Sequence, residues 1–258
     1  MVRSRFKINA VKILSLILAL GFFTRALALP APVPPSRFSF YLGPRLYFSR
    51  IDSLDRSNGG KATFLSNMNI AVDWSIARPF GVSKKLLSIV YGNFALENYA
   101  DANNGFAKYS HITKAFGFGK KYILTPKFGL MGKIGYTEEA FSRAIAQGLY
   151  AVDAVPEGKF EILAGYSSLF SASLVYLDGT FGLALYTPQL HSSYHGQFGE
   201  GYLIKLDVKK NLNYSQIRCG IYFKERFQGT NLIEQTMQEV GLMAGVKWWS
   251  KILIIKLN

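Results

Sequence analysis

The sequence has few residues of the kinds that build disulfide frameworks, metal sites or membrane helices. It contains one cysteine, Cys219, and three histidines, so an intrachain disulfide is excluded. Charged residues make up only 18% of the 258 residues. Outside residues 11–23, no apolar run approaches the ~20 residues that a membrane helix requires. The mature chain is therefore neither a disulfide-stapled domain nor a helical membrane protein.

Aromatic residues and glycine are abundant instead. Aromatics make up 15% of the chain, 24 residues are glycine, and the mean hydropathy of +0.13 is high. Disordered chains have few aromatics, so this composition argues for an ordered fold. Apolar content without long apolar runs is typical of a membrane β-barrel, in which only alternate residues face lipid.

The N-terminus has the three parts of a secretory signal peptide. Basic residues come first, and the apolar stretch 13–23 and the small residues of Ala26-Leu27-Ala28 follow. We expect residues 1–28 to be a cleaved signal peptide. Residues 29–36 contain four prolines and favour an extended spacer on the periplasmic side. Residues 37–258 would then form the barrel.

The charge is strongly basic. The formal net charge is +14, and five basic residues of the signal segment contribute to it, which leaves +9 on the mature chain. Such a charge attracts lipid phosphates or small anions. We expect outer-membrane lipids and lipopolysaccharide, the barrel-assembly machinery and small anions as partners. Scattered charges on an exported chain argue against nucleic acid, and no cofactor is predicted.

Long period-2 alternation of apolar and polar residues predicts strands with one apolar face. The fold class is all-β, a single antiparallel up-and-down transmembrane β-barrel of about ten strands, within bounds of eight and twelve. The predicted strands are 37–51, 61–77, 85–97, 106–123, 127–137, 159–177, 180–187, 201–209, 214–226 and 236–249.

The predicted connections alternate between short and long, as periplasmic turns and extracellular loops do. The clearest tight turns are predicted at 125–127, Asp178-Gly179 and 210–213. The longest loop is 138–158, where a helical stripe predicts a short helix. The rival prediction is an extra hairpin over 142–170, which would make twelve strands.

The alternation also assigns the two faces. Phe64, Trp74 and Trp248 are among the aromatics predicted at the strand ends of the lipid face, and Pro44 requires an unpaired or bulged position. The polar, basic-leaning inward face is predicted to carry Arg45, Lys61, Asp73, Lys133, Lys205, Asp207, Arg218, Lys224, Glu239 and Lys247.

On these patterns the chain resembles the small Gram-negative outer-membrane barrels, in the broad sense of the OmpA, OmpX and OmpW-like group. The stretch Ala115–Tyr136 resembles the strand, tight turn and strand units of that group. The segment Glu239–Val246 is similar to the last-strand signal of barrel precursors. The resemblance implies a structural, surface-binding or narrow-pore protein of the bacterial outer membrane that is not an enzyme.

One alternative function is an outer-leaflet lipid-modifying enzyme. His191-x-Ser193, with Glu200 nearby, resembles the His-x-Ser element of the lipid A deacylases, in which a histidine activates a serine. Tyr194 stands where that family has asparagine. His191 and His195 have a helical metal-ligand spacing, but the glycines around them disfavour a helix, so no metal site is predicted.

The signal-peptide hypothesis predicts a mature chain that begins close to Leu29, because Ala26 and Ala28 offer small residues at the cleavage positions. N-terminal sequencing of membrane-extracted protein checks this. A membrane-embedded product that retains residues 1–23 would contradict export by this route.

Overall fold

The computed structural model describes residues 38–80, 85–102, 108–146, 149–170, 175–188, 197–212 and 215–249. The predicted signal peptide and spacer lie outside these residues. The described residues form strands β1 (Ser39–Asp55), β2 (Lys61–Ser66), β3 (Asn69–Pro79), β4 (Leu86–Asp101), β5 (Lys108–Ile123), β6 (Phe128–Ala146), β7 (Leu149–Phe170), β8 (Val175–Tyr186), β9 (Gly199–Asn211), β10 (Ser215–Gly229) and β11 (Ile233–Trp249). None of the described residues belongs to a helix long and apolar enough to cross a membrane.

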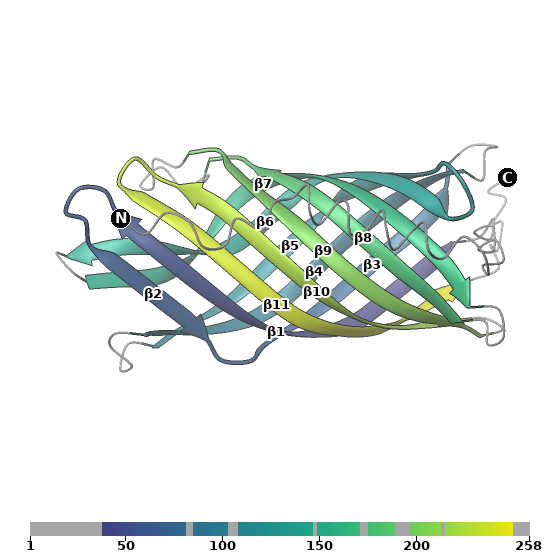
Figure 1. Ribbon diagram of the computed structural model, residues 1–258, viewed down its shortest axis with the longest axis horizontal. Helices are drawn as coiled ribbons and strands as arrows, with labels where there is room; N and C mark the ends of the chain where they lie inside the picture. The colour runs from purple at the N-terminus through teal and green to yellow at the C-terminus, as the bar shows by residue number, and fades with distance from the viewer. Residues whose placement is uncertain are drawn as a thin grey trace, which may run out of the picture.

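The strands form one closed antiparallel barrel (Figure 1). Apart from β2 and β3, each strand pairs with its neighbour in sequence, and β1 pairs with β11 from Ser39 opposite Trp249 to Asp55 opposite Ile233. β2 and β3 both pair with β1 on one side and with β4 on the other, so they are two halves of one barrel strand. The barrel therefore has ten strands, which confirms the predicted fold class and strand number.

The two ends of the barrel differ. Ser39 and Trp249 are register partners, so both ends of the barrel chain lie at one end, with the short turns after β5 and β9. We call this the periplasmic end and the opposite one the extracellular end. At the periplasmic end the predicted turn at 125–127 is confirmed by hydrogen bonds between Leu124 and Phe128, as is the turn at 210–213 by the bond from Leu212 to Ser215.

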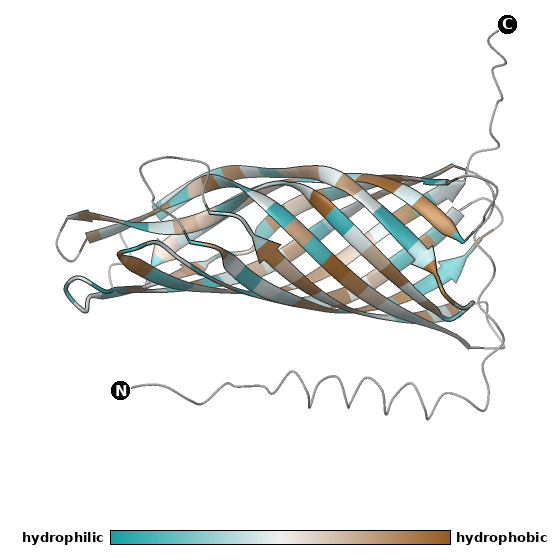
Figure 2. Cartoon of the chain, turned by 90° about the horizontal axis from the view of Figure 1, so that it is seen from above, coloured by the Kyte–Doolittle hydropathy of each residue, from teal (hydrophilic) through white to brown (hydrophobic). Residues whose placement is uncertain are grey.

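The outer face is apolar over a band that fits a membrane. Outward residues of β1 are apolar from Phe40 to Phe48, and Arg50 and Asp52 follow on the same face. Eight residues at ~3.3 Å each, tilted by ~40°, give ~20 Å, close to the ~25 Å of a barrel's apolar band. Trp248 stacks on Phe40 at the periplasmic edge, with ring centroids 5.8 Å apart. Figure 2 shows the alternation of hydropathy along the strands.

A bulge divides the second barrel strand and exchanges its faces. Between two register pairs, Tyr47 opposite Asn69 and Arg50 opposite Leu65, β1 has two residues and the partner has three. One extra residue shifts a strand's side chains to the other face. Phe64 is consequently buried inside the barrel, and Lys61 is exposed on the outside at the hairpin tip. The predicted outward Phe64 and inward Lys61 are both wrong for this reason.

Two other local predictions are wrong. Asp178 and Gly179 form no turn, because they lie within β8 and pair with Asp207 and Leu206 of β9. Residues 138–158 form neither a helix nor an extra hairpin. β6 continues to Ala146 and β7 begins at Leu149, so the two strands extend as one long hairpin at the extracellular end.

Pro44 lies where the ladder permits it. The register between β1 and β11 has no pair from Gly43 to Pro44, between Leu42 opposite Val246 and Arg45 opposite Met243. Proline has no N–H to donate, so the ladder is interrupted here on the β11 side only, and Pro44 still pairs with Val72 of β3. The Tyr41 hydroxyl donates a hydrogen bond of 3.4 Å to the Ala244 carbonyl at this gap.

Closure predicts heat-modifiable migration. A barrel with no open edge keeps every strand paired on both sides, so SDS should not unfold it until it is heated. Refolded protein should run faster before boiling than after it on an SDS gel, with β-type circular dichroism. Equal mobility with a helical spectrum would contradict the fold.

Candidate functional site: the lumen of the barrel

An apolar plug fills the extracellular part of the lumen. It is a cluster of buried side chains from six strands, with Tyr109 of β5 packed against it. The plug consists of Ile51, Ala62, Phe64, Tyr99, Ala140, Tyr150, Val152 and Met237. All are at most 6% exposed, so water is excluded from this level. Three of them, Ala140, Tyr150 and Val152, come from the long β6–β7 hairpin.

Hydrogen bonds attach this hairpin to the other walls of the barrel. The Gln235 side chain of β11 accepts a bond of 2.7 Å from the Ser142 backbone N–H and donates one of 3.1 Å to the Ala140 carbonyl. The Tyr109 hydroxyl donates a bond of 2.8 Å to the Tyr150 carbonyl. Because β11 is far from β6 in the strand order, the two bonds of Gln235 cross the mouth of the barrel. The β6–β7 hairpin therefore forms part of the closure.

Beneath the plug, buried charges form a paired layer. Arg226 contacts Glu157 at 2.7 Å, and Lys224 contacts Glu139 at 2.8 Å. Arg226 and Glu157 are almost fully buried. A buried charge without a partner costs several kcal/mol, so these pairs are a condition of folding. The Tyr47 hydroxyl donates a bond of 2.5 Å to the Glu97 carboxylate at the same level.

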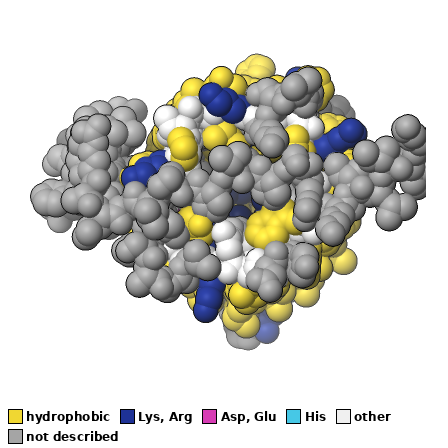
Figure 3. Space-filling view, turned by 90° about the vertical axis from the view of Figure 1, so that its right-hand side faces the viewer, with side chains coloured by type: hydrophobic (Ala, Val, Ile, Leu, Met, Phe, Trp, Pro, Cys, Tyr) yellow, Lys and Arg dark blue, Asp and Glu magenta, His cyan; other side chains and the backbone are white. Residues whose placement is uncertain are grey.

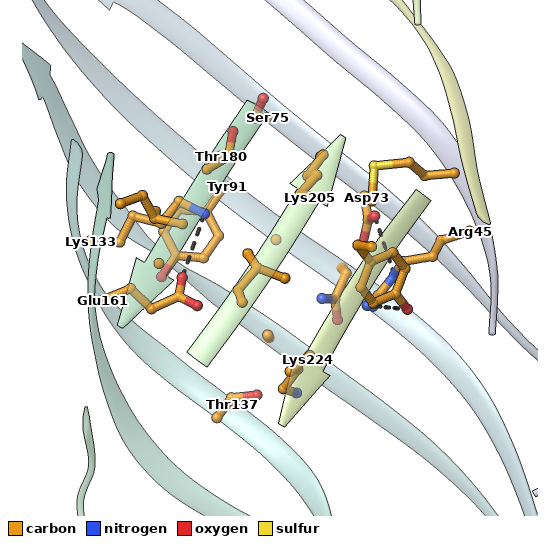
Figure 4. Close-up of a pocket in the computed structure, with 18 of the residues that line it drawn as sticks. Arg45, Asp73, Ser75, Tyr91, Lys133, Thr137, Glu161, Thr180, Lys205 and Lys224 are labelled. Atoms are coloured by element: carbon orange, nitrogen blue, oxygen red, sulfur yellow. Dashed lines mark hydrogen bonds and ion pairs between the residues drawn. The ribbon is translucent and has the colours of Figure 1, made fainter. Parts of the chain in front are cut away.

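Further pairs line the middle of the lumen (Figure 4). Arg45 lies between Glu239 at 2.9 Å and Asp73 at 3.4 Å, and Tyr222 also donates to Glu239. Lys133 lies 3.5 Å from Glu161, whose other oxygen is 2.6 Å from Lys159. This layer has three basic side chains and three carboxylates, so its charges balance as a group and not pair by pair.

A cavity of about 420 Å³ runs through the lumen below the plug, from Lys121 and Lys247 near the periplasmic end to Glu97 and Glu139 at the paired layer. Its walls carry five basic side chains that we call the vestibule cations: Lys121, Lys205, Lys209, Arg218 and Lys247. Lys209 pairs with Asp178, and Arg218 pairs with Asp207. Seen from the periplasmic end, the centre of the molecule is hollowed and Lys and Arg side chains are visible in it (Figure 3). The vestibule is thus basic and faces the periplasmic end.

Nine of the ten side chains predicted for the lumen lie inside the barrel. Eight line the cavity, namely Arg45, Asp73, Lys133, Lys205, Arg218, Lys224, Glu239 and Lys247. Asp207 is fully buried against Arg218 and Lys205. Lys61 is the exception, on the outer face.

Several lumen residues escape the sequence analysis. They are Glu97, Lys121, Glu139, Glu157, Lys159, Glu161, Asp178, Lys209 and Arg226. Glu97 and Lys121 were missed because apolar and polar residues alternate only weakly in the segments 85–97 and 106–123. Glu139 and Glu157 were missed because they lie in the segment 138–158, which was predicted to be a loop. Most of the missed residues are acidic, so the middle of the lumen is less basic than the sequence suggests. The excess of positive charge is confined to the vestibule.

The described residues do not show how the side chains named for the enzyme alternative are arranged. His191 and Ser193 lie outside them, as does His195. Glu200 is the second residue of β9, and its side chain is exposed between the buried Gly199 and Gly201. Within the described ranges no three His, Cys, Asp or Glu side chains gather into a metal-ligand set.

Comparison with known proteins supports the fold. No family model and no curated protein match the sequence. Among solved structures, the outer-membrane protease OmpT of Escherichia coli matches with a TM-score of 0.50 and 11% identity, over 88% of this chain and 100% of that one. An outer-membrane channel of Pseudomonas putida F1 gives a TM-score of 0.47 and 9% identity, over 84% and 96% of the two chains. The chain is thus similar in fold to outer-membrane barrels.

The paired layer predicts a large stability loss when one partner is removed. Arg226→Met keeps much of the side-chain volume but leaves Glu157 without its cation. We expect the free energy of unfolding to fall by ~3–5 kcal/mol in urea titrations of the folded protein.

Arg143→Met is the matched control. Arg143 contacts Asp153 at 2.8 Å, but both side chains are solvent-accessible, so the loss should stay below ~1 kcal/mol. Equal effects of the two substitutions would refute the paired layer.

Proposed function

We propose that this protein is a normally closed, narrow barrel of the bacterial outer membrane that admits small anions when the β6–β7 hairpin moves. One observation carries the proposal: a basic cavity of about 420 Å³ lies below a plug formed partly by a hairpin. A purely structural barrel would have no need of an accessible basic cavity. A permanently open pore would have no plug.

The hairpin is the element most suited to move. The barrel wall is held by continuous backbone ladders, whereas three side-chain bonds, two from Gln235 and one from Tyr109, attach the hairpin to the other walls at the mouth. A typical hydrogen bond contributes about 1 kcal/mol net, so such an attachment is reversible. Movement of the tip would withdraw Tyr150 and Val152 from the lumen.

Fixed positive charge supports the preference for anions. The vestibule cations lower the barrier to anions and raise it to cations, and added salt weakens this effect by screening. The narrow bore of a ten-stranded barrel also limits the size of the solute.

The partners follow from the surface and the last strand. We propose that the apolar band contacts outer-membrane lipids, with lipopolysaccharide beside its extracellular edge. The barrel-assembly machinery would recognise β11, and the cleaved signal peptide would direct export. We also propose a protein without enzymatic activity; His191 and Ser193, on which the lipid A deacylase-like alternative depends, lie outside the described residues.

Loss of the hairpin attachment should open the barrel. Gln235→Ala removes the two bonds of the Gln235 side chain. Planar-bilayer recordings of this variant should then show more frequent openings than recordings of the wild type. The openings should be small and anion-selective, with weaker selectivity at high salt. Adding Tyr150→Ala should increase them further.

Glu234→Ala is the matched control, since Glu234 precedes Gln235 but points outward and pairs with Arg56 at 2.6 Å. It should leave the recordings unchanged. If neither hairpin variant shows currents, the proposed conduction is wrong. Cation-selective currents would contradict the proposed preference for anions.

A further inference from the structure

Four basic side chains converge from opposite walls of the vestibule. Lys121 comes from β5, whereas Lys209, Arg218 and Lys247 come from β9, β10 and β11. All four side chains line the same cavity, together with Lys205. Like charges repel, so such a group is stable only when water or an anion lies among its members.

The carboxylates present do not balance this group. Asp178 is engaged by Lys209 and by the Ser167 hydroxyl at 2.6 Å, and Asp207 is engaged by Arg218. Among the described residues no carboxylate lies within ion-pair distance of Lys121 or Lys247. Among those residues the buried Nε–H of Arg218 and the buried Oδ1 of its partner Asp207 have no hydrogen-bond partner. The cavity walls therefore carry two ammonium groups without a carboxylate partner among the described residues, beside the guanidinium of Arg218.

We propose that the vestibule binds a small phosphate-class oxyanion that enters from the periplasmic end. The proposal rests on the proposed function in naming its solute, but it needs no movement of the plug, because the cavity lies below the plug. A phosphate offers several acceptor oxygens and up to two negative charges, which suits donors arriving from several sides. Arg and Lys are the side chains that proteins use for this recognition.

The cavity has room for more than the anion. The whole lumen cavity, of which the vestibule is the periplasmic part, has a volume of about 420 Å³, which compares with ~30 Å³ for one water and lies within the ~300–1,000 Å³ of ligand pockets. Gln216 and Tyr41 line the cavity near Lys247 and Arg218, and both offer neutral polar groups. An organic phosphate with a short polar substituent therefore fits the same site. Free phosphate and a lipid-headgroup phosphate share the chemistry and are separated by the choice of probe.

Calorimetric titration of the refolded protein in an uncharged detergent tests the site. The probes are inorganic phosphate and glycerol 3-phosphate, with chloride salt at equal ionic strength as the reference. We expect saturable binding of at least one probe, with tighter binding of glycerol 3-phosphate if the headgroup is the source. Lys121→Gln/Lys247→Gln should weaken binding at least tenfold, and each single substitution should weaken it by less.

Lys61→Gln/Lys108→Gln is the matched control, because it removes the same charge from exposed side chains outside the lumen. It should leave the affinity unchanged. The single variants keep the test valid if the double variant does not give the heat-modifiable band. Absence of saturable binding of both probes, or equal weakening in the lumen and control variants, would overturn the proposal.

The bilayer recordings test conduction independently of the binding measurements. Binding without currents in the hairpin variants would refute the channel and leave the site standing. Currents in those variants without phosphate binding would refute the site and leave the channel standing.

Discussion

The pairing of β1 with β11 is the constraint on which the rest of this structure depends. In a membrane no water is available to unpaired backbone N–H and C=O groups, each of which costs several kcal/mol. The register from Ser39 opposite Trp249 to Asp55 opposite Ile233 removes the last open edge. Closure also divides the residues of every strand between a lipid face and a narrow lumen. The inward charges of strands far apart in sequence are thereby brought within reach of one another.

The levels of the narrow lumen differ in how far water can reach the charged side chains. In the plug side chains exclude water, and just beneath it Arg226 and Glu157 are almost fully buried, so the charge of Arg226 must have a carboxylate beside it. In the vestibule an accessible cavity allows hydration, so Lys121 and Lys247 can remain without ion pairs. The same strands therefore provide rigidity at one level and a binding surface for anions at another.

The sequence predicts the barrel well because alternation is a local property of each strand. The prediction fails where the structure of a segment depends on contacts with residues far away in the sequence. Asp178-Gly179 has the composition of a turn, yet Asp178 is held within β8 by Lys209 of the neighbouring strand. Lys61 and Phe64 exchange faces because one extra residue opposes β1, which no pattern within the segment reveals.

The sequence by itself determined the all-β class, the number of barrel strands, most of their positions and most of the basic lumen residues it named. These follow from period-2 alternation, whose cause is the two-sided environment of a membrane strand. Only the tertiary structure decided that the β6–β7 hairpin closes the extracellular mouth. It also decided that Glu139 and Glu157 neutralise the cations of the paired layer and that the positive charge remains in the vestibule. The physical reason is that ion pairing and closure depend on distances across the barrel, and these are set by the register of all ten strands together.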